Sequence, residues 1–204
     1  SIASYNPMAK PHLLEKITHL KELQAEKLVS ETLQQLNSAL KLSSSERIIK
    51  VAINIADDLE GGWTNRYSTD FDNKFKINGL ISRNFCTPIL WSSENYTKEL
   101  IIERTRTYAY RSLFWLNRGS RLISLEDHLA QEVFVAQKRN ASLSFAPQDI
   151  LGLKLFYEQH SKTELYSIIF NFFYGDEAAQ ALGYPTYGIG NLKGFDYVTY
   201  LANI

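Results

Sequence analysis

The stretch that decides the fold is SSSERIIKVAINIADDLEGG, residues 43–62, in which a run of apolar residues leads into three acids and two glycines. Ser43 and Glu46 have the spacing of a capping box, which opens many helices, and the glycine pair suits the left-handed residue that closes them. On a helical wheel the apolar residues between Glu46 and Leu59 cover most of the circumference. The stretch therefore predicts a buried helix that ends near Leu59.

Acidic residues at the end of this predicted helix are unfavourable. The carbonyl end of a helix carries partial negative charge, which disfavours each exposed acid by a few tenths to about 1 kcal/mol. A functional role would offset that cost. We interpret Asp57 and Asp58 as candidate ligand-binding residues, together with three residues of the loop that follows, Trp63, Asn65 and Arg66. The alternative is a polar, solvated helix face.

The remaining pattern predicts an all-α fold. Helical spacing of apolar residues, capping residues and helix-breaking residues favour further helices at residues 11–41, 92–117, 124–140, 147–160, 161–174 and 176–182. The apolar face of the first changes phase at the polar stretch near residues 24–27, so either this helix bends there or its halves pack against different neighbours. Residues 61–92 and the aromatic tail from residue 183 are predicted to be irregular, with residues 80–91 able to hold a short strand or extended segment. We expect a single-domain helical bundle of six or seven helices over residues 1–204.

Composition and charge are those of an ordinary globular protein, with 45% hydrophobic residues, 22% charged residues and zero formal net charge. The lone Cys86 excludes an internal disulfide, and no apolar run is long enough for a membrane span or a signal core. We expect a soluble, cytoplasmic protein with no membrane partner.

Seven of the nine arginines lie in residues 61–123, and in a neutral chain this favours internal ion pairs over nucleic-acid binding.

A metal-binding site is the most specific chemical hypothesis that the sequence offers. The predicted helix at residues 92–117 carries Glu103 at an apolar position, and the next helix carries His128 and Glu132 one turn apart. An imidazole with carboxylates inside a helical bundle is typical of a site for a divalent metal such as Fe, Mn or Zn. The chain has neither paired Glu-x-x-His motifs nor His-Glu-x-x-His. A buried network of glutamates and arginines with a core histidine is the alternative.

Two functions of different class follow. In the first, an internal polar pocket holds a divalent metal or a small anionic ligand, with Arg104 and Arg111 joining Arg66 in binding the anion. In the second, the protein is a non-catalytic interaction or scaffold protein, its buried ion pairs are structural, and its 12 tyrosines and 11 phenylalanines supply a homo-oligomer interface. The sequence assigns no reaction and no substrate.

Overall fold

A computed structural model describes residues 3–4, 10–40, 48–59, 64–118, 121–143, 145–189 and 193–204. Helices make up 65% of these described residues and strands 6%, so the predicted, mostly helical class is confirmed. Nine α-helices lie in these ranges, more than the six or seven expected. Within the same ranges no helix is long and apolar enough to cross a membrane.

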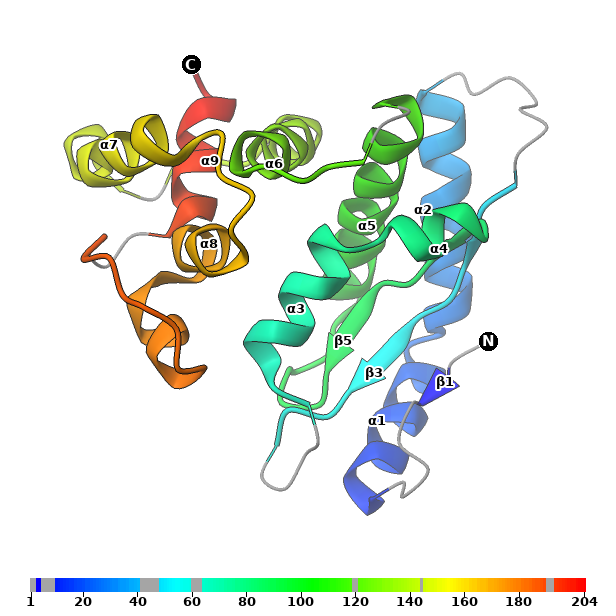
Figure 1. Cartoon of the computed structure of the whole chain (residues 1–204). Coiled ribbons are helices and arrows are strands. Elements are labelled where there is room, and N and C mark those ends of the chain that lie inside the picture. The colour runs from blue at the N-terminus through cyan, green and yellow to red at the C-terminus, as the bar shows by residue number, and fades with distance from the viewer. Residues whose placement is uncertain are drawn as a thin grey trace. The chain divides into compact units, whose positions relative to one another are not determined.

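Residue contacts divide the chain into two compact units, residues 1–116 and 117–204. The first unit is built on short parallel strands, and the second is helical (Figure 1). The single domain over residues 1–204 stays a prediction.

The strands of the first unit correct the predicted helix over residues 46–59, of which residues 48–59 are described. Strands β2 (Lys50–Val51) and β3 (Asn54–Ala56) lie there instead. β2 pairs in parallel with β4 (Phe85–Cys86), and β3 pairs in parallel with β5 (Ile89–Trp91) and with β1 (Ala3–Ser4). The β2–β4 and β3–β5 pairs are aligned with the same offset along the chain. Backbone hydrogen bonds donated by Ala52 and Asn54 continue the pairing across the residues between β2 and β3.

The physical reason for the error is the apolar composition of this segment, whose residues from Val51 to Ala56 are all buried or half-buried. A parallel strand that is covered on both faces reads as a nearly continuous apolar run, which a helical wheel also accommodates. Residues 48–55 are rich in isoleucine and valine, whose branched side chains fit a pleated sheet better than a helix. The capping residues Ser43 and Glu46 lie outside the described residues.

The segment over residues 61–92 is also more regular than predicted. It contains α3 (Arg66–Phe75) and α4 (Asn78–Ser82), followed by β4 and β5. The chain from β3 through α3 to β5 is therefore a crossover between parallel strands, a connection that normally needs a helix. Asn65 caps α3 by accepting a hydrogen bond from the Ser68 backbone amide at 3.0 Å.

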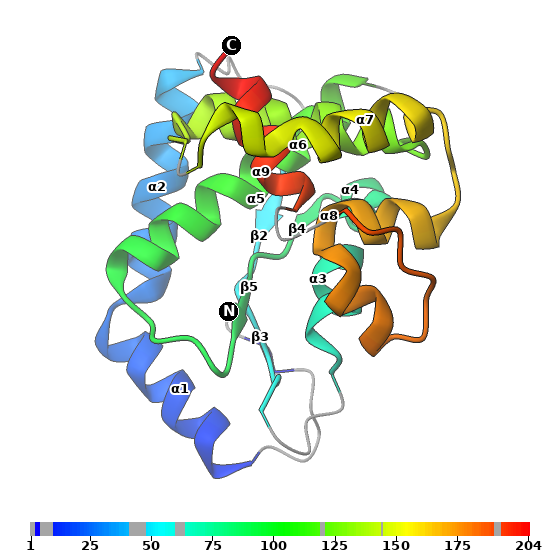
Figure 2. The ribbon, with the colours of Figure 1, turned by 90° about the vertical axis from the view of Figure 1, so that its left-hand side faces the viewer.

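Helices cover the sheet of the first unit. The predicted bend in the first helix is confirmed as a break, because α1 (Pro11–Glu22) and α2 (Ala25–Ala39) are separated at Gln24, whose φ is 55°. Both helices lie on one side of the strands and α3 on the other (Figure 2). Ile55 and Leu90 pack against α1 and α2, as does part of α5 (Lys98–Arg118).

The second unit matches the sequence prediction more closely. The capping box of Ser124 and Asp127 opens α6 (Leu125–Arg139), as expected. A 3₁₀ turn (Pro147–Ile150) leads into α7 (Leu151–His160), and α8 (Tyr166–Ala181) bends at Gly175, whose φ is 83°. The two helices predicted over residues 161–182 are the two arms of this bend.

The C-terminal tail corrects the predicted irregular structure, since α9 (Gly194–Ala202) is a helix packed against α6, α7 and α8. The sequence signal that suggested irregularity was the number of glycines. Gly194 has a packing role instead, because a Cβ there would lie 2.5 Å from ring carbons of Phe172 and 2.9 Å from the Phe172 carbonyl oxygen.

Gly194→Ala is expected to lower the free energy of unfolding by about 2 kcal/mol, the usual cost of forcing extra atoms into a packed interior. The Phe172 ring is fully buried and has no room to move aside. Urea unfolding followed by circular dichroism measures the loss. The matched control is Gly152→Ala on α7, where a new Cβ meets nothing within 4 Å and the change should stabilise the helix by up to about 1 kcal/mol. Equal effects of the two substitutions would contradict the packing described here.

Candidate functional site

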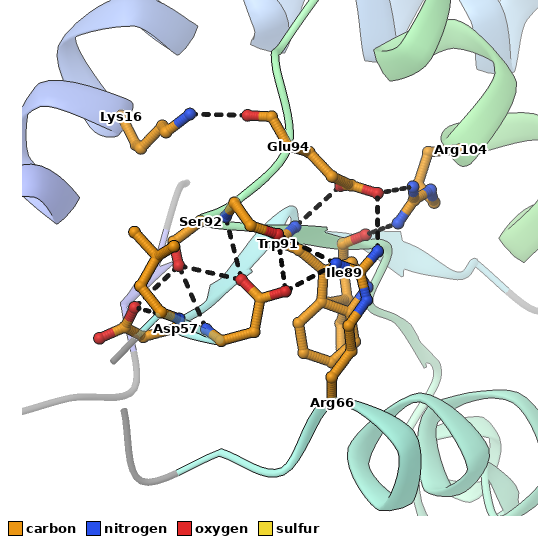
Figure 3. A network of polar contacts seen from close by, with 11 residues as sticks. Lys16, Asp57, Arg66, Ile89, Trp91, Ser92, Glu94 and Arg104 are labelled. Atoms are coloured by element: carbon orange, nitrogen blue, oxygen red, sulfur yellow. Dashed lines mark hydrogen bonds and ion pairs between the residues drawn. The ribbon is translucent and has the colours of Figure 1, made fainter. Parts of the chain in front are cut away.

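Polar side chains gather at the carboxyl ends of β3 and β5. Asp57 and Asp58 follow β3 directly, and Ser92 and Ser93 follow β5. Because the strands are parallel and in register, both pairs leave the sheet at the same edge, which is where ligands bind in open parallel sheets. Figure 3 shows this edge, which we call the carboxyl edge; it is defined by these four residues and Glu94.

Asp58 connects three elements at the carboxyl edge. Its carboxylate accepts hydrogen bonds from the Ser93 amide at 2.9 Å, the Ser93 hydroxyl at 2.7 Å and Arg66 Nη1 at 2.8 Å. Burial raises the pKa of Asp58, but the hydrogen bonds from Ser93 and the charge of Arg66 outweigh it and hold the pKa below the usual value. Asp58 is therefore ionised at neutral pH, and donors occupy both of its oxygens.

Asp57 differs from Asp58 in having one oxygen without a donor. Its Oδ1 accepts from the Ser92 hydroxyl at 2.7 Å and lies 3.0 Å from His12 Nε2. Its Oδ2 is buried and has no hydrogen-bond partner in the described part of the chain, and Lys10 Nζ lies 3.7 Å away. Burial raises the pKa of Asp57, yet the bonds from Ser92 and His12 bring it below the usual value. The carboxyl edge thus holds a buried negative oxygen that has no hydrogen-bond donor among the described residues.

Glu94 connects the loop after β5 to α5 and α1 through hydrogen bonds. Its Oε1 accepts from Arg104 Nη2 at 2.7 Å and its Oε2 from the Trp91 amide at 2.9 Å. Arg104 also donates to the Ile89 carbonyl at 2.5 Å, and Lys16 Nζ donates to the Glu94 carbonyl at 2.6 Å (Figure 3). This arrangement fixes the position of the loop that carries Ser92 and Ser93.

Tyr96 adds a second buried polar atom without a partner. Its side chain is 2% exposed, and its hydroxyl makes no hydrogen bond within the described ranges. Burial, together with the negative charges of Glu94 and Asp58, raises its pKa far above the usual value, so the hydroxyl stays protonated. Lys16 Nζ lies 4.7 Å from the centre of the Tyr96 ring.

The structure brings together some of the ligand-binding residues predicted from the sequence. Asp57, Asp58 and Arg66 meet at the carboxyl edge, and Arg104 reaches it through Glu94. Asn65 lies next to them but serves as the cap of α3, and Trp63 is outside the described residues. Arg111 makes none of the contacts described at the carboxyl edge. It is buried, and its guanidinium lies 5.1 Å from the Tyr108 ring centre.

The predicted metal ligands gain no support. Glu103 lies on α5 in the first unit, whereas His128 and Glu132 lie on α6 in the second. Glu132 accepts a hydrogen bond from Gln131 Nε2 at 2.7 Å, and His128 is buried. Across the described ranges no group of three or more His, Cys, Asp or Glu residues is arranged to hold a metal ion.

Sequence reasoning missed Ser92, Ser93 and Glu94 of the carboxyl edge, and also His12 and Tyr96 beside it. The helix predicted over residues 92–117 placed these serines at its start, but α5 begins later, at Lys98. The usable signal is the position of polar pairs after apolar runs, Asp57-Asp58 after one strand and Ser92-Ser93 after the next. That signal has meaning only once both runs are recognised as parallel strands.

No protein-family model, no curated protein and no solved structure matches this chain.

Proposed function

We propose that this protein binds a small polar ligand at the carboxyl edge. The observation that carries the proposal is Asp57 Oδ2, a charged oxygen that is buried and has no hydrogen-bond donor among the described residues. A buried acceptor left without a partner costs about 1–3 kcal/mol, and more when it is charged. A bound ligand that donates to this oxygen would recover that free energy.

The surroundings of Asp57 support a binding site. Lys10, Lys16 and His12 bring cationic or titratable groups from the start of α1, and Arg66 comes from the first turn of α3. Ser92 and Glu94 hold the loop after β5 in place, so most polar groups are already oriented before a ligand arrives. Preorganisation of this kind lowers the entropic cost of binding.

A thermal-shift screen of the whole chain against small polar molecules tests the proposal. A ligand present at about 100 times its Kd stabilises the folded state by about 2.7 kcal/mol, which raises the Tm of a chain of this size by several degrees. Asp57→Asn should abolish the shift. Asp72→Asn, which removes a carboxylate paired with Lys76 on the exposed surface of α3, should leave it unchanged. A hit that shifts wild type and Asp57→Asn equally would place the ligand elsewhere.

A structural role for the ion pairs is the second candidate function. It is favoured by one observation, that Asp58 is paired with Arg66 and Glu94 with Arg104, so both arginines already have carboxylate partners. In that case the protein is the non-catalytic interaction or scaffold protein of the second hypothesis. The same screen separates the candidates, because a scaffold gives no ligand shift that depends on Asp57.

A further inference from the structure

We propose that the group which docks on Asp57 Oδ2 is the cationic end of the ligand, a primary ammonium or a guanidinium. The inference rests on the proposed function and narrows it to one charge class. It departs from the anionic ligand expected from the sequence, and the reasons lie in how the charges at the carboxyl edge are already paired.

The first reason is that the hydrogen bonds to the Asp57 carboxylate go to only one of its two oxygens. The Ser92 hydroxyl and His12 both bond to Oδ1, and the Leu59 amide also points to Oδ1 at 3.4 Å. These three donors therefore converge on one oxygen and leave Oδ2 open. The side chain is only 3% exposed, so bulk water solvates Oδ2 poorly.

The second reason is that a cation already forms an ion pair with Oδ2, although it makes no hydrogen bond to this oxygen. Lys10 Nζ is 3.7 Å away, too far for a hydrogen bond but close enough to show that positive charge suits the position. The Lys10 side chain is one-third exposed and precedes the first turn of α1. A ligand cation with better geometry would take the place of Lys10 at Oδ2.

The third reason is that the arginines are poorly placed to bind an incoming anion. Arg66 Nη1 contacts Asp58 and Ser93, and Arg104 divides its donors between Glu94 and the Ile89 carbonyl. An anion would have to compete with these carboxylates and would approach the charges of Asp57 and Asp58. A cation at Oδ2 competes with Lys10, whereas His12 contacts the other oxygen, Oδ1.

The Tyr96 hydroxyl is a second buried polar group, under the influence of the Glu94 and Asp58 charges. It is buried, it has no hydrogen-bond partner among the described residues, and Glu94 and Asp58 both act on its ionisation. A hydroxyl can accept from an ammonium or donate to a polar atom beside it. We expect the ligand to carry such a polar atom next to its cationic group.

Three probes of nearly the same size test the charge class: ethanolamine, ethylene glycol and glycolate. Binding to the whole chain is followed by the amide NMR signals of Ser92 and Ser93. Ethanolamine is expected to bind about tenfold or more tightly than ethylene glycol, the ratio typical of a charge-assisted hydrogen bond, and more tightly than glycolate. Failure of ethanolamine to perturb these amides, or preferential binding of glycolate, overturns the inference.

Two substitutions give effects of opposite sign. Asp57→Asn should remove the preference for ethanolamine, whereas Lys10→Gln should tighten ethanolamine binding several-fold because the competing cation is gone. An anionic ligand would reverse both signs. Lys10 is partly exposed, so its variant keeps the test valid even if Asp57→Asn fails to fold. Screening hits that depend on Asp57 but lack a cation defeat this inference alone; absence of any hit defeats the proposed function as well.

Discussion

Glu94→Ala is expected to lower the free energy of unfolding by about 3 kcal/mol, the lower end of the cost of leaving one member of a buried ion pair without its partner. The substitution removes the carboxylate from Arg104 and the acceptor from the Trp91 amide. Both side chains of the ion pair are at most one-fifth exposed, so water replaces the lost contacts poorly. Urea unfolding of the whole chain measures the change.

The matched control for this prediction is Glu94→Gln. Glutamine keeps one acceptor oxygen, replaces the other with an amide nitrogen of similar size and loses the charge, so it should cost less than the alanine variant. The Lys16 bond goes to the Glu94 carbonyl and survives in both variants. An alanine variant within about 0.5 kcal/mol of wild type, the range of ordinary surface substitutions, would show that Glu94 does not hold the loop after β5.

Acidification is expected to destabilise the protein by about 3 kcal/mol through His128 alone, since a tenfold change in proton affinity corresponds to about 1.4 kcal/mol. Burial lowers the pKa of His128 from 6.5 to about 4, although the charges of Asp127 and Glu132 oppose this effect. Between these two values the unfolded chain binds a proton that the folded chain does not. Stability therefore falls as the pH drops from about 6.5 to about 4.

The measurement is urea unfolding of wild type and His128→Asn at several pH values across this window. Carboxylates contribute equally to both proteins, so the difference between the two curves isolates the imidazole. The difference should shrink as the pH falls. Parallel curves would mean that His128 is accessible to protons in the folded state, which would return it to consideration as a functional group.

The helices of the second unit could be predicted because their signals are local. The Ser124 and Asp127 capping box identified the start of α6, and in the first unit the polar stretch near Gln24 likewise marked the break between α1 and α2. These features depend on hydrogen bonds within a few residues along the chain. The parallel strands were missed because their pairing is non-local, and a buried parallel strand has no alternating pattern of its own.

The candidate site was recognised in part for the same reason. Asp57, Asp58 and Arg66 are close in sequence and stood out as a local pattern. Ser93 and Glu94 join them only through the register of β3 with β5, and His12 joins them only through the packing of α1. The separate set of Glu103, His128 and Glu132 was assembled from helical wheels, which report where a side chain points but not which neighbours it meets.

The central claim is that Asp57 presents an ionised, incompletely bonded oxygen at the carboxyl edge, and a carboxyl-carbon NMR titration of Asp57 tests it most directly. The hydrogen bonds from Ser92 and His12 predict a pKa below the ordinary value of 3.8, and addition of ethanolamine at neutral pH should move the Asp57 carboxyl signal. A pKa at or above the ordinary value, with no response to ethanolamine, would contradict both the bonding pattern and the binding site built on it.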